Sequence, residues 1–278
     1  MRPFKKITIV GVGLLGGSVG LAVRKHKLAD KVTGFFRDKG KIAAAVKMGA
    51  VDEGTDDLKK AVALSGLIIL CSPVSDIIKK LKILKKIAGK TTIITDTGST
   101  KSKIVKAATP LNFIGSHPLT GSEQSGVSHA RADLFKNSIL ILTPQHCKQS
   151  KSLTRLAEFW EKLGSKTIVM TPEKHDHILA FSSHLPHATA FSLMQALPKE
   201  TIGFAAGGLK DATRIALSNP DIWADIFLSN SKEVLKSINA FETSLKTLKK
   251  AVAGQDKKEL VCFLRQAKDK RRLIPSRS

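Results

Sequence analysis

Cysteine, tyrosine and long apolar runs are scarce or absent in this chain. Its only cysteines are Cys71, Cys147 and Cys262, with no C-x-x-C pair, which argues against a structural zinc site and is typical of a reducing cytosol. No tyrosine occurs among the 278 residues, and the composition offers no physical reason for this. The longest apolar runs, such as 67–71, are too short to span a membrane, and residues 1–10 lack the features of a signal peptide. We therefore expect a cytoplasmic protein without a membrane segment.

Acidic residues are also scarce, since 23 Asp and Glu face 46 Lys and Arg and leave a net charge of +23. Such a charge suits a nucleic-acid binder, which is one alternative for the function. The basic residues are spread along the whole chain, however, and the densest cluster, 268–272, is expected to be a solvated tail. A basic field also attracts small anionic substrates and phosphate-bearing cofactors. Because no base-reading motif accompanies the charge, we expect no specific nucleic-acid partner.

Hydrophobic periodicity divides the chain into two parts. Up to about residue 170, short β-type runs alternate with helical patterns, which predicts a parallel sheet covered on both faces. Beyond Pro172 the strand signals stop and helical spacing continues. We therefore expect an α/β fold, with a Rossmann-type dinucleotide-binding domain (1–171) followed by an all-helical domain (172–278). The expected strands are 7–10, 31–36, 67–71, 92–95, 112–114, 139–142 and 166–170, and the expected C-terminal helical segments are 173–197, 201–217, 221–250 and 256–270.

A G-x-G-x-x-G pattern directly follows the first expected strand and opens the first expected helix. In this context Gly11 permits the tight turn, Gly13 lets the backbone approach a pyrophosphate, and Gly16 lets the helix pack on the strand. The helix N-terminus then presents free N–H groups to the phosphates. The predicted cofactor-binding residues are Gly11, Val12, Gly13, Leu14, Leu15 and Gly16, together with Ser72 and Pro73 at the end of the strand at 67–71.

The end of the second strand indicates the kind of nicotinamide cofactor. NAD sites usually have an acidic residue there, whereas NADP sites have an arginine. Phe36 occupies the expected acidic position, Arg37 follows it, and Asp38 comes late enough to cap the next helix instead. Arg37 is suited to pairing with a 2′-phosphate and stacking on adenine. This pattern favours NADP, and a strand end shifted by one residue would leave NAD as the alternative.

A histidine follows the expected strand at 112–114, which we predict to end at Gly115. The segment Gly115-Ser116-His117-Pro118 continues into a glycine-containing loop, with Glu123 six residues beyond the histidine. Open α/β folds place their chemistry at the carboxyl edge of the sheet, and imidazole titrates near neutral pH. A lone His-Pro would by itself favour a capping histidine in a surface turn. The remaining motifs make a catalytic His117 the better hypothesis.

Three more segments accompany the His117 segment: TDTGSTK at 95–101, SHLPHA at 183–188 and KDATRIA at 210–216. Together with the glycine pattern, and in this order, they resemble the prephenate dehydrogenase family, which includes arogenate and cyclohexadienyl dehydrogenases of tyrosine biosynthesis. The resemblance extends from residue 7 to about residue 270. It implies an NAD(P)-dependent oxidative decarboxylation of prephenate or arogenate, and the sequence does not decide between the two substrates. The alternative within enzymes is another oxidoreductase of the same two-domain kind, acting on a small hydroxy or imino acid.

The resemblance also implies roles for single residues. His117 matches the family's catalytic histidine, which accepts a hydrogen bond from the C4 hydroxyl of the substrate as the C–H bond begins to break. Ser99 matches the serine that helps to orient that histidine and hydroxyl. Arg214 matches the arginine that holds a substrate carboxylate, for which a planar guanidinium is well shaped. The other residues implied in substrate binding or at its entrance are His187, Glu123, Asp211 and Ser116.

Several of these residues have plainer alternatives. Ser99 is also placed to cap the helix that begins near Lys101, and Arg214 and Asp211 have the spacing of a surface ion pair. His184 and His187 share a helix face, but no cysteine or carboxylate set completes a metal shell, so we expect no metal site. Apolar residues on more than one face of the helical part predict a homodimer interface. The expected partners are thus a small dicarboxylate substrate and a second copy of the chain.

Overall fold

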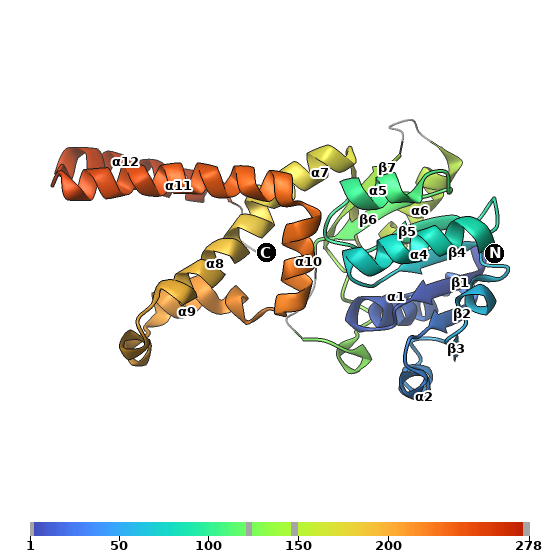
Figure 1. Ribbon diagram of the computed structural model, residues 1–278. Helices are drawn as coiled ribbons and strands as arrows, with labels where there is room; N and C mark the ends of the chain where they lie inside the picture. Colours follow the sequence, from blue (N-terminus) through green and yellow to red (C-terminus); the bar gives the residue numbers. More distant parts are fainter. Residues whose placement is uncertain (1–2, 121–123, 146–149, 275–278) are drawn as a thin grey trace. The chain divides into compact units, whose positions relative to one another are not determined.

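The computed structural model describes residues 3–120, 124–145 and 150–274. Glu123 and Cys147 lie outside this described part of the chain. Contacts group the chain into two compact units, Met1–Ser231 and Lys232–Ser278. The first unit contains every strand and the helices up to α10, and the second contains most of α11 and all of α12 (Figure 1).

A five-stranded parallel sheet forms the centre of the first unit, in the order β3-β2-β1-β4-β5. This is the strand order of a dinucleotide-binding fold. All the strands are parallel, and the order in which they are added to the sheet reverses between β1 and β4. In register, Val10 at the end of β1 lies opposite Phe35 on one side and Leu70 on the other. The carboxyl ends of the three central strands therefore meet at one edge. Their bounds are β1 Phe4–Val10, β2 Ala29–Phe35, β3 Glu53–Thr55, β4 Leu67–Leu70 and β5 Ile93–Asp96.

Alternation along the strands explains why helices cover both faces of this sheet. In β4 all four residues are buried; Leu67 and Ile69 belong to one apolar cluster, while Ile68 and Leu70 belong to the other. The first cluster includes side chains of α1, α2 and α6, and the second includes those of α3, α4 and α5. The helices are α1 Leu14–Lys25, α2 Ile42–Lys47, α3 Leu58–Val62, α4 Val74–Ile87, α5 Ser102–Ala108 and α6 Lys151–Lys162.

The remaining three strands form a separate sheet, in the order β6-β7-β8. They are β6 Ile114–Pro118, β7 Ile139–Pro144 and β8 Lys166–Val169, and β6 runs antiparallel to β7. The expectation that the strand at 112–114 ends at Gly115 is therefore wrong. Phe113 makes only one bridge to the main sheet, through Ile94, after which the chain turns away and begins β6. The prediction also missed β3 and α3, which span three and five residues and are too short to show a period.

The part of the first unit that follows β8 is helical, as predicted. Thr171 caps α7 (Pro172–Leu179) by accepting a hydrogen bond from Lys174 N, and Pro172 occupies the position where a missing N–H costs nothing. A π-helical turn, Ala180–His184, joins α7 to α8 (Leu185–Ala196). The segments that follow are the 3₁₀ turn Lys199–Phe204, α9 Gly207–Thr213, the 3₁₀ turn Arg214–Leu217 and α10 Pro220–Ser229.

The second unit contains α11 (Ser231–Ala253) from its second residue onward and α12 (Lys257–Arg272), which are joined by a turn at 254–256. Asp256 caps α12 by accepting a hydrogen bond from Glu259 N at 2.8 Å. No helix in the described ranges is long and apolar enough to cross a membrane.

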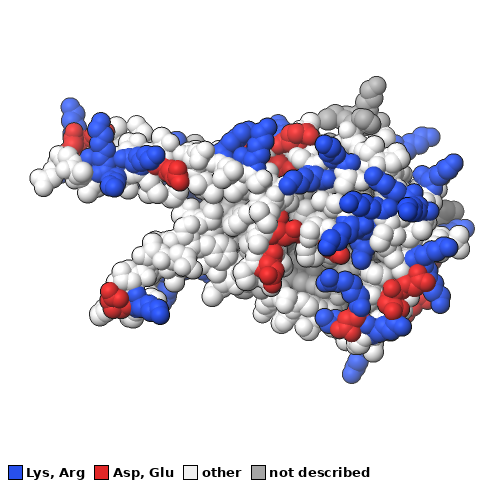
Figure 2. Space-filling view, in the orientation of Figure 1, with Lys and Arg blue, Asp and Glu red and all other residues white. Residues whose placement is uncertain are grey.

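Basic side chains gather over α4 and α5 on the face shown in Figure 2. The exposed lysines of these two helices include Lys79, Lys82, Lys86, Lys103 and Lys106. Other Lys and Arg residues occur elsewhere on that face, with acidic side chains among them. This distribution follows the spread of the charge along the sequence.

The close packing of α1 on the chain segment before β3 can be tested by substitution of Gly20. A Cβ on Gly20 would lie 1.8 Å from the carbonyl oxygen of Ala50, which is backbone and has little freedom to move. We expect Gly20→Ala to lower the free energy of unfolding, measured by urea denaturation, by about 1–3 kcal/mol. Gly208→Ala is the matched control, because it is also helical but has no atom within 4 Å of the added Cβ. It should leave stability unchanged or raise it; equal effects in the two variants would contradict the packing.

Candidate active site

The turn after β1 has the geometry that the glycine pattern predicts. Gly11 has a φ of +95°, and a Cβ there would lie 2.6 Å from the carbonyl oxygen of Cys71. A Cβ on Gly16 would lie 2.1 Å from the carbonyl oxygen of Gly11. Gly13 has open space around it and precedes the first residue of α1. Glycine is therefore required at 11 and 16 by the fold, whereas the open side of Gly13 is available to a ligand.

A cavity of about 310 Å³ opens at this turn, at the carboxyl edge of the main sheet. The Oγ atom of Ser72 is buried and has no hydrogen-bond partner within the described residues. An unpaired hydroxyl beside an open glycine and a helix N-terminus fits the phosphates of a dinucleotide. Val12 is buried behind the turn. The predicted residues that line the cavity are Gly13, Leu14, Leu15, Ser72, Pro73 and Ser99, and α10 adds Ile222, Asp225 and Ile226.

The end of β2 has no free carboxylate at the position typical of NAD sites. Phe36 is buried there, with its ring so close to Gly34 and Gly54 that a Cβ on either would lie under 3 Å from it. Arg37 is the first exposed residue after the strand. Asp38 caps the following 3₁₀ turn by accepting a hydrogen bond from Gly40 N at 2.9 Å. This is the capping role that the sequence offered for Asp38 as the alternative to binding a cofactor.

Cys71 also lines the cavity. Burial raises the pKa of its thiol to about 12, so that it stays protonated near neutral pH. The side chain of Cys71 packs against the main apolar core, as a small apolar residue does.

His117 lies within β6, opposite Ile141 of β7, and not in a loop after a strand as the sequence suggested. Its ring Nδ1 is 2.8 Å from Nε2 of His175, which is on α7 and fully buried. The other ring nitrogen of His175, Nδ1, is 2.8 Å from Oδ1 of Asp176. Asp176 accepts hydrogen bonds from the backbone N–H groups of Lys101 (2.7 Å) and Ser102 (2.8 Å). One continuous hydrogen-bonded chain thus connects the β6 histidine to the start of α5.

A buried ion pair binds both backbone groups of Ser116, the residue before His117. Lys101 and Asp96 are both fully buried and their side chains form an ion pair. Lys101 Nζ also donates to the carbonyl oxygen of Ser116 at 2.8 Å, and Asp96 Oδ1 accepts from Ser116 N at 3.1 Å. Burial raises the pKa of Asp96 and lowers the pKa of Lys101, and the attraction between the two opposes both shifts.

The two predicted serines have different surroundings. Ser116 is fully buried, and its Oγ lies 2.6 Å from Thr95 Oγ1 and accepts a hydrogen bond from Trp160 Nε1 at 3.2 Å. These contacts make it a support for β6, so the hydroxyl is not free for a substrate. Ser99 lines the dinucleotide cavity instead.

The π-helical turn positions two further histidines. Pro186 has no N–H to donate to the preceding turn, which explains the local widening before α8. His184 is buried, with Nδ1 3.3 Å from the side-chain amide of Asn230, while His187 stacks on Trp223 with a ring separation of 3.5 Å. Burial, and then the charge of Arg214, lower the pKa of His187, so the predicted His187 and Arg214 are close enough to interact. Asp211 and Arg214 are both exposed and, in the part of the chain that is described, form no ion pair with each other.

Burial keeps the site histidines neutral. Desolvation, followed by the proximity of His175, Lys101 and His184, holds the pKa of His117 well below its usual value of 6.5. Burial likewise lowers the pKa of His184 to about 4 and also lowers that of His175. Neutral imidazoles at neutral pH are able to accept a proton or a hydrogen bond. Across 3–120, 124–145 and 150–274, no three His, Cys, Asp or Glu side chains are grouped to hold a metal ion.

Comparison with known proteins identifies the family. The family model described as prephenate dehydrogenase, nucleotide-binding domain, matches residues 19–169, and that described as prephenate dehydrogenase, dimerization domain, matches 171–266. A cyclohexadienyl dehydrogenase of Zymomonas mobilis is 36% identical, over 92% of this chain and 91% of its own. The chain belongs to the prephenate dehydrogenase family. The resemblance seen in the sequence motifs is thereby confirmed.

Solved structures of this family have the same fold. The prephenate dehydrogenase of A. aeolicus, in complex with hydroxyphenyl propionate and NAD+, is 35% identical and superimposes with a TM-score of 0.90 over 99% of both chains. The arogenate dehydrogenase of Synechocystis is 31% identical, with a TM-score of 0.83 over 96% of this chain and 98% of its own. These matches confirm the predicted architecture of a Rossmann-type domain followed by helices.

Sequence reasoning missed several residues that surround His117 and His187 in the structure. His175, Asp176, Trp223 and Asn230 are not among the residues that the sequence motifs single out. The adjacent His-Asp pair at the start of a helix was the only available signal, and such a pair is usually exposed. Asp96 and Lys101 belong to the TDTGSTK segment, but a lysine after a glycine-serine turn gives no sign in the sequence that it is buried.

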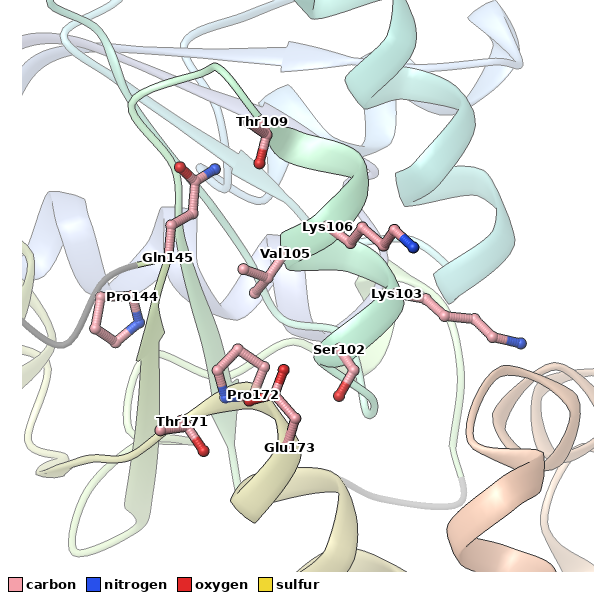
Figure 3. Close-up of a pocket in the computed structure, with 10 residues that line it drawn as sticks. All are labelled: Ser102, Lys103, Val105, Lys106, Thr109, Pro144, Gln145, Thr171, Pro172 and Glu173. Carbon is pink, nitrogen blue, oxygen red and sulfur yellow. The ribbon is translucent and has the colours of Figure 1, made fainter.

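A second cavity of about 500 Å³ lies between α5 and the start of α7 (Figure 3). None of the predicted site residues lines it. Its two lysines, Lys103 and Lys106, extend away from Pro144 and Pro172 (Figure 3), and Lys103 Nζ donates to the carbonyl oxygen of Leu228 at 2.9 Å.

The Asp96–Lys101 pair makes a prediction about stability. Lys101→Met leaves the Asp96 carboxylate buried without its cation and Ser116 O without its donor, and we expect it to lower the free energy of unfolding by about 3–5 kcal/mol. Urea denaturation of the purified protein measures this. Lys106→Met, at an exposed position on α5, is the control and should change stability by about 0.5 kcal/mol or less. A loss no greater than that of the control would show that the pair does not stabilise the fold.

Proposed function

We propose that this protein oxidises prephenate or arogenate with a pyridine nucleotide and releases the ring carboxylate as carbon dioxide. The observation that carries this proposal is the position of His117 relative to the dinucleotide cavity. Ser116 N donates to Asp96, the last residue of β5, and the residues directly after Asp96 line the cavity. A neutral imidazole is thus held beside the place where a nicotinamide cofactor would bind. Family membership supplies the reaction that this arrangement would serve.

His117 would act on the C4 hydroxyl of the substrate. Its low pKa keeps the ring neutral, so it is able to accept the hydroxyl proton as the bond between C4 and its hydrogen breaks. A bound nicotinamide supplies the acceptor for the hydride that leaves C4. Loss of the ring carboxylate as carbon dioxide then makes the ring aromatic, which drives the reaction. Ser99 lines the same cavity and is proposed to orient the hydroxyl.

We propose that Arg214 binds a carboxylate of the substrate and that His187 helps to position it. Arg214 is exposed and close enough to lower the pKa of His187, whose ring is fixed against Trp223. Because its guanidinium forms no ion pair with Asp211 in the described part of the chain, Arg214 is available to bind a carboxylate of the substrate. Asp211 and Glu123 are kept as proposed acidic residues at the entrance, with Glu123 outside the described residues.

The assembly, location and domain roles are proposals of the same kind. We propose nucleotide binding for residues 1–171 and substrate binding with homodimer formation for 172–278, since the strands end with β8 and the second family model is described as a dimerization domain. Exposed apolar residues on α8, α11 and α12 would be covered in such a dimer, among them Leu193, Leu235, Leu245, Val261 and Leu264. The cytoplasm is the proposed location.

The test of this function is a turnover assay of both substrates with both cofactors. Reduction of the cofactor and release of carbon dioxide are followed together, and we expect equal amounts of the two for at least one pair. In His117→Asn we expect kcat to fall by about 100- to 10,000-fold with little change in cofactor affinity, because the proton acceptor is lost. His177→Gln, an exposed histidine on α7, is the control.

The pH dependence gives a second check on His117. The active form is neutral, so kcat/KM should fall as the pH is lowered through the pKa of His117, which lies below 6.5. A variant lacking His117 that turns over at nearly the wild-type rate would remove the residue from the mechanism. Cofactor reduction without carbon dioxide would favour the other hydroxyacid or imino-acid oxidoreductase.

We also propose NADP as the preferred cofactor. Arg37 is exposed at the end of β2, and the position typical of an NAD-binding carboxylate is occupied by buried Phe36. Replacing Arg37 by Gln should lower the ratio of kcat/KM for NADP over NAD by about 10- to 100-fold, the range for a lost charge-assisted hydrogen bond. Lys31→Gln, near the other end of β2, is the control for loss of charge. A wild-type enzyme with a strong preference for NAD would contradict the assignment.

A further inference from the structure

We propose that His175 and Asp176 select the ring tautomer of His117, and so act as positioning residues for the proposed dehydrogenase reaction. The inference rests on the proposed role of His117 as the proton acceptor. It starts from the chain of contacts in which Asp176 Oδ1, the two ring nitrogens of His175 and Nδ1 of His117 are linked by two distances of 2.8 Å. Two residues that do not reach the dinucleotide cavity would then decide which nitrogen of His117 carries its proton.

Asp176 sets the direction of the hydrogen bonds, because it is held as a carboxylate. Both of its oxygens accept backbone N–H groups, Oδ1 from Lys101 and Oδ2 from Ser102. Burial raises the pKa of Asp176, but hydrogen bonds from His175 and Ser102 outweigh this effect and leave its pKa below the usual value. An ionised carboxylate only accepts hydrogen bonds, so Nδ1 of His175 must be the donor.

The direction of the next bond follows from the single ring proton of a neutral imidazole. Burial lowers the pKa of His175, so near neutral pH the ring is neutral and its proton is on Nδ1. Nε2 of His175 is then an acceptor, and Nδ1 of His117 must donate to it. The proton of neutral His117 is therefore on Nδ1, which leaves the lone pair of Nε2 free. That lone pair is what a proton acceptor for the substrate hydroxyl requires.

The surroundings keep this arrangement rigid. His175 and Asp176 are buried, and the side-chain amide of Asn230 donates to the backbone oxygen of Asp176 at 2.8 Å. Ser116, the neighbour of His117, is held through its N–H and its carbonyl by Asp96 and Lys101. The two rings are thus held in their orientations, so that the 2.8 Å contact between them persists and continues to favour one tautomer of His117.

The tautomer can be observed directly, without turnover. Nitrogen-15 NMR of the full-length protein at neutral pH distinguishes a ring nitrogen that carries a proton from one that does not, and comparison with His117→Asn assigns the His117 signals. We expect His117 to be protonated on Nδ1 and unprotonated on Nε2. A His117 protonated on Nε2 in the wild-type protein would overturn the proposal.

Two substitutions of His175 separate positioning from mere packing. The Oε1 atom of a glutamine occupies nearly the same place as Nε2 of histidine and is also an acceptor, whereas leucine offers none. We expect His175→Leu to lower kcat by about 100-fold or more, and His175→Gln to retain kcat within about 10-fold of wild type, with cofactor KM little changed in both. His177→Gln on the same helix is the control. Equal losses of kcat in the Gln and Leu variants, or none in either, would overturn the proposal.

The two sets of measurements keep this inference distinct from the proposed function. If the wild-type protein turns over neither prephenate nor arogenate, the proposed function fails, while the NMR result still decides the tautomer. If the wild-type protein is active but His117 carries its proton on Nε2, the function stands and the tautomer selection fails. A His175→Leu protein that does not fold leaves the wild-type spectrum as the deciding measurement.

Discussion

The buried ion pair between Asp96 and Lys101 is the constraint on which the site depends. Asp96 ends β5 and Lys101 precedes α5, so the pair closes the turn that carries Ser99 to the dinucleotide cavity. The same two side chains bind both backbone groups of Ser116 and thereby fix β6, which belongs to a different sheet. Removing two charges from water is costly, and hydrogen bonds to the backbone offset that cost here. The turn that lines the cavity and the strand that contains His117 are in this way held by one contact.

Helices from beyond the strand-containing part complete the site. Asp225 of α10 accepts a hydrogen bond from Ser75 N at the start of α4, and Ile222 and Ile226 line the dinucleotide cavity. His175 and Asp176 of α7 reach His117 and the start of α5 from another side. The histidine is therefore surrounded by residues from both halves of the family's architecture, which explains its low pKa and its fixed orientation.

Local features were predictable and long-range ones were not. The glycine turn was predicted residue by residue, because a positive φ at Gly11 and the close approach at Gly16 depend on atoms near in sequence. The capping role of Asp38 is equally local. The strand containing His117 was predicted too early, because Gly115, Ser116 and Pro118 have little intrinsic preference for a strand and are held there by pairing with β7.

The sequence by itself determined the order of elements, the phosphate-binding turn and the family, since each follows from local pattern or from motifs in a particular order. It also singled out His117, Ser99 and Arg214 as the residues to examine. Only the tertiary structure revealed what surrounds His117, because its partner His175 lies 58 positions further along the chain, and Asp176, which holds His175, is bound in turn by the backbone of Lys101. Hydrogen-bond partners that far apart leave no periodic trace in a sequence; the folded backbone alone brings them within 3 Å of one another.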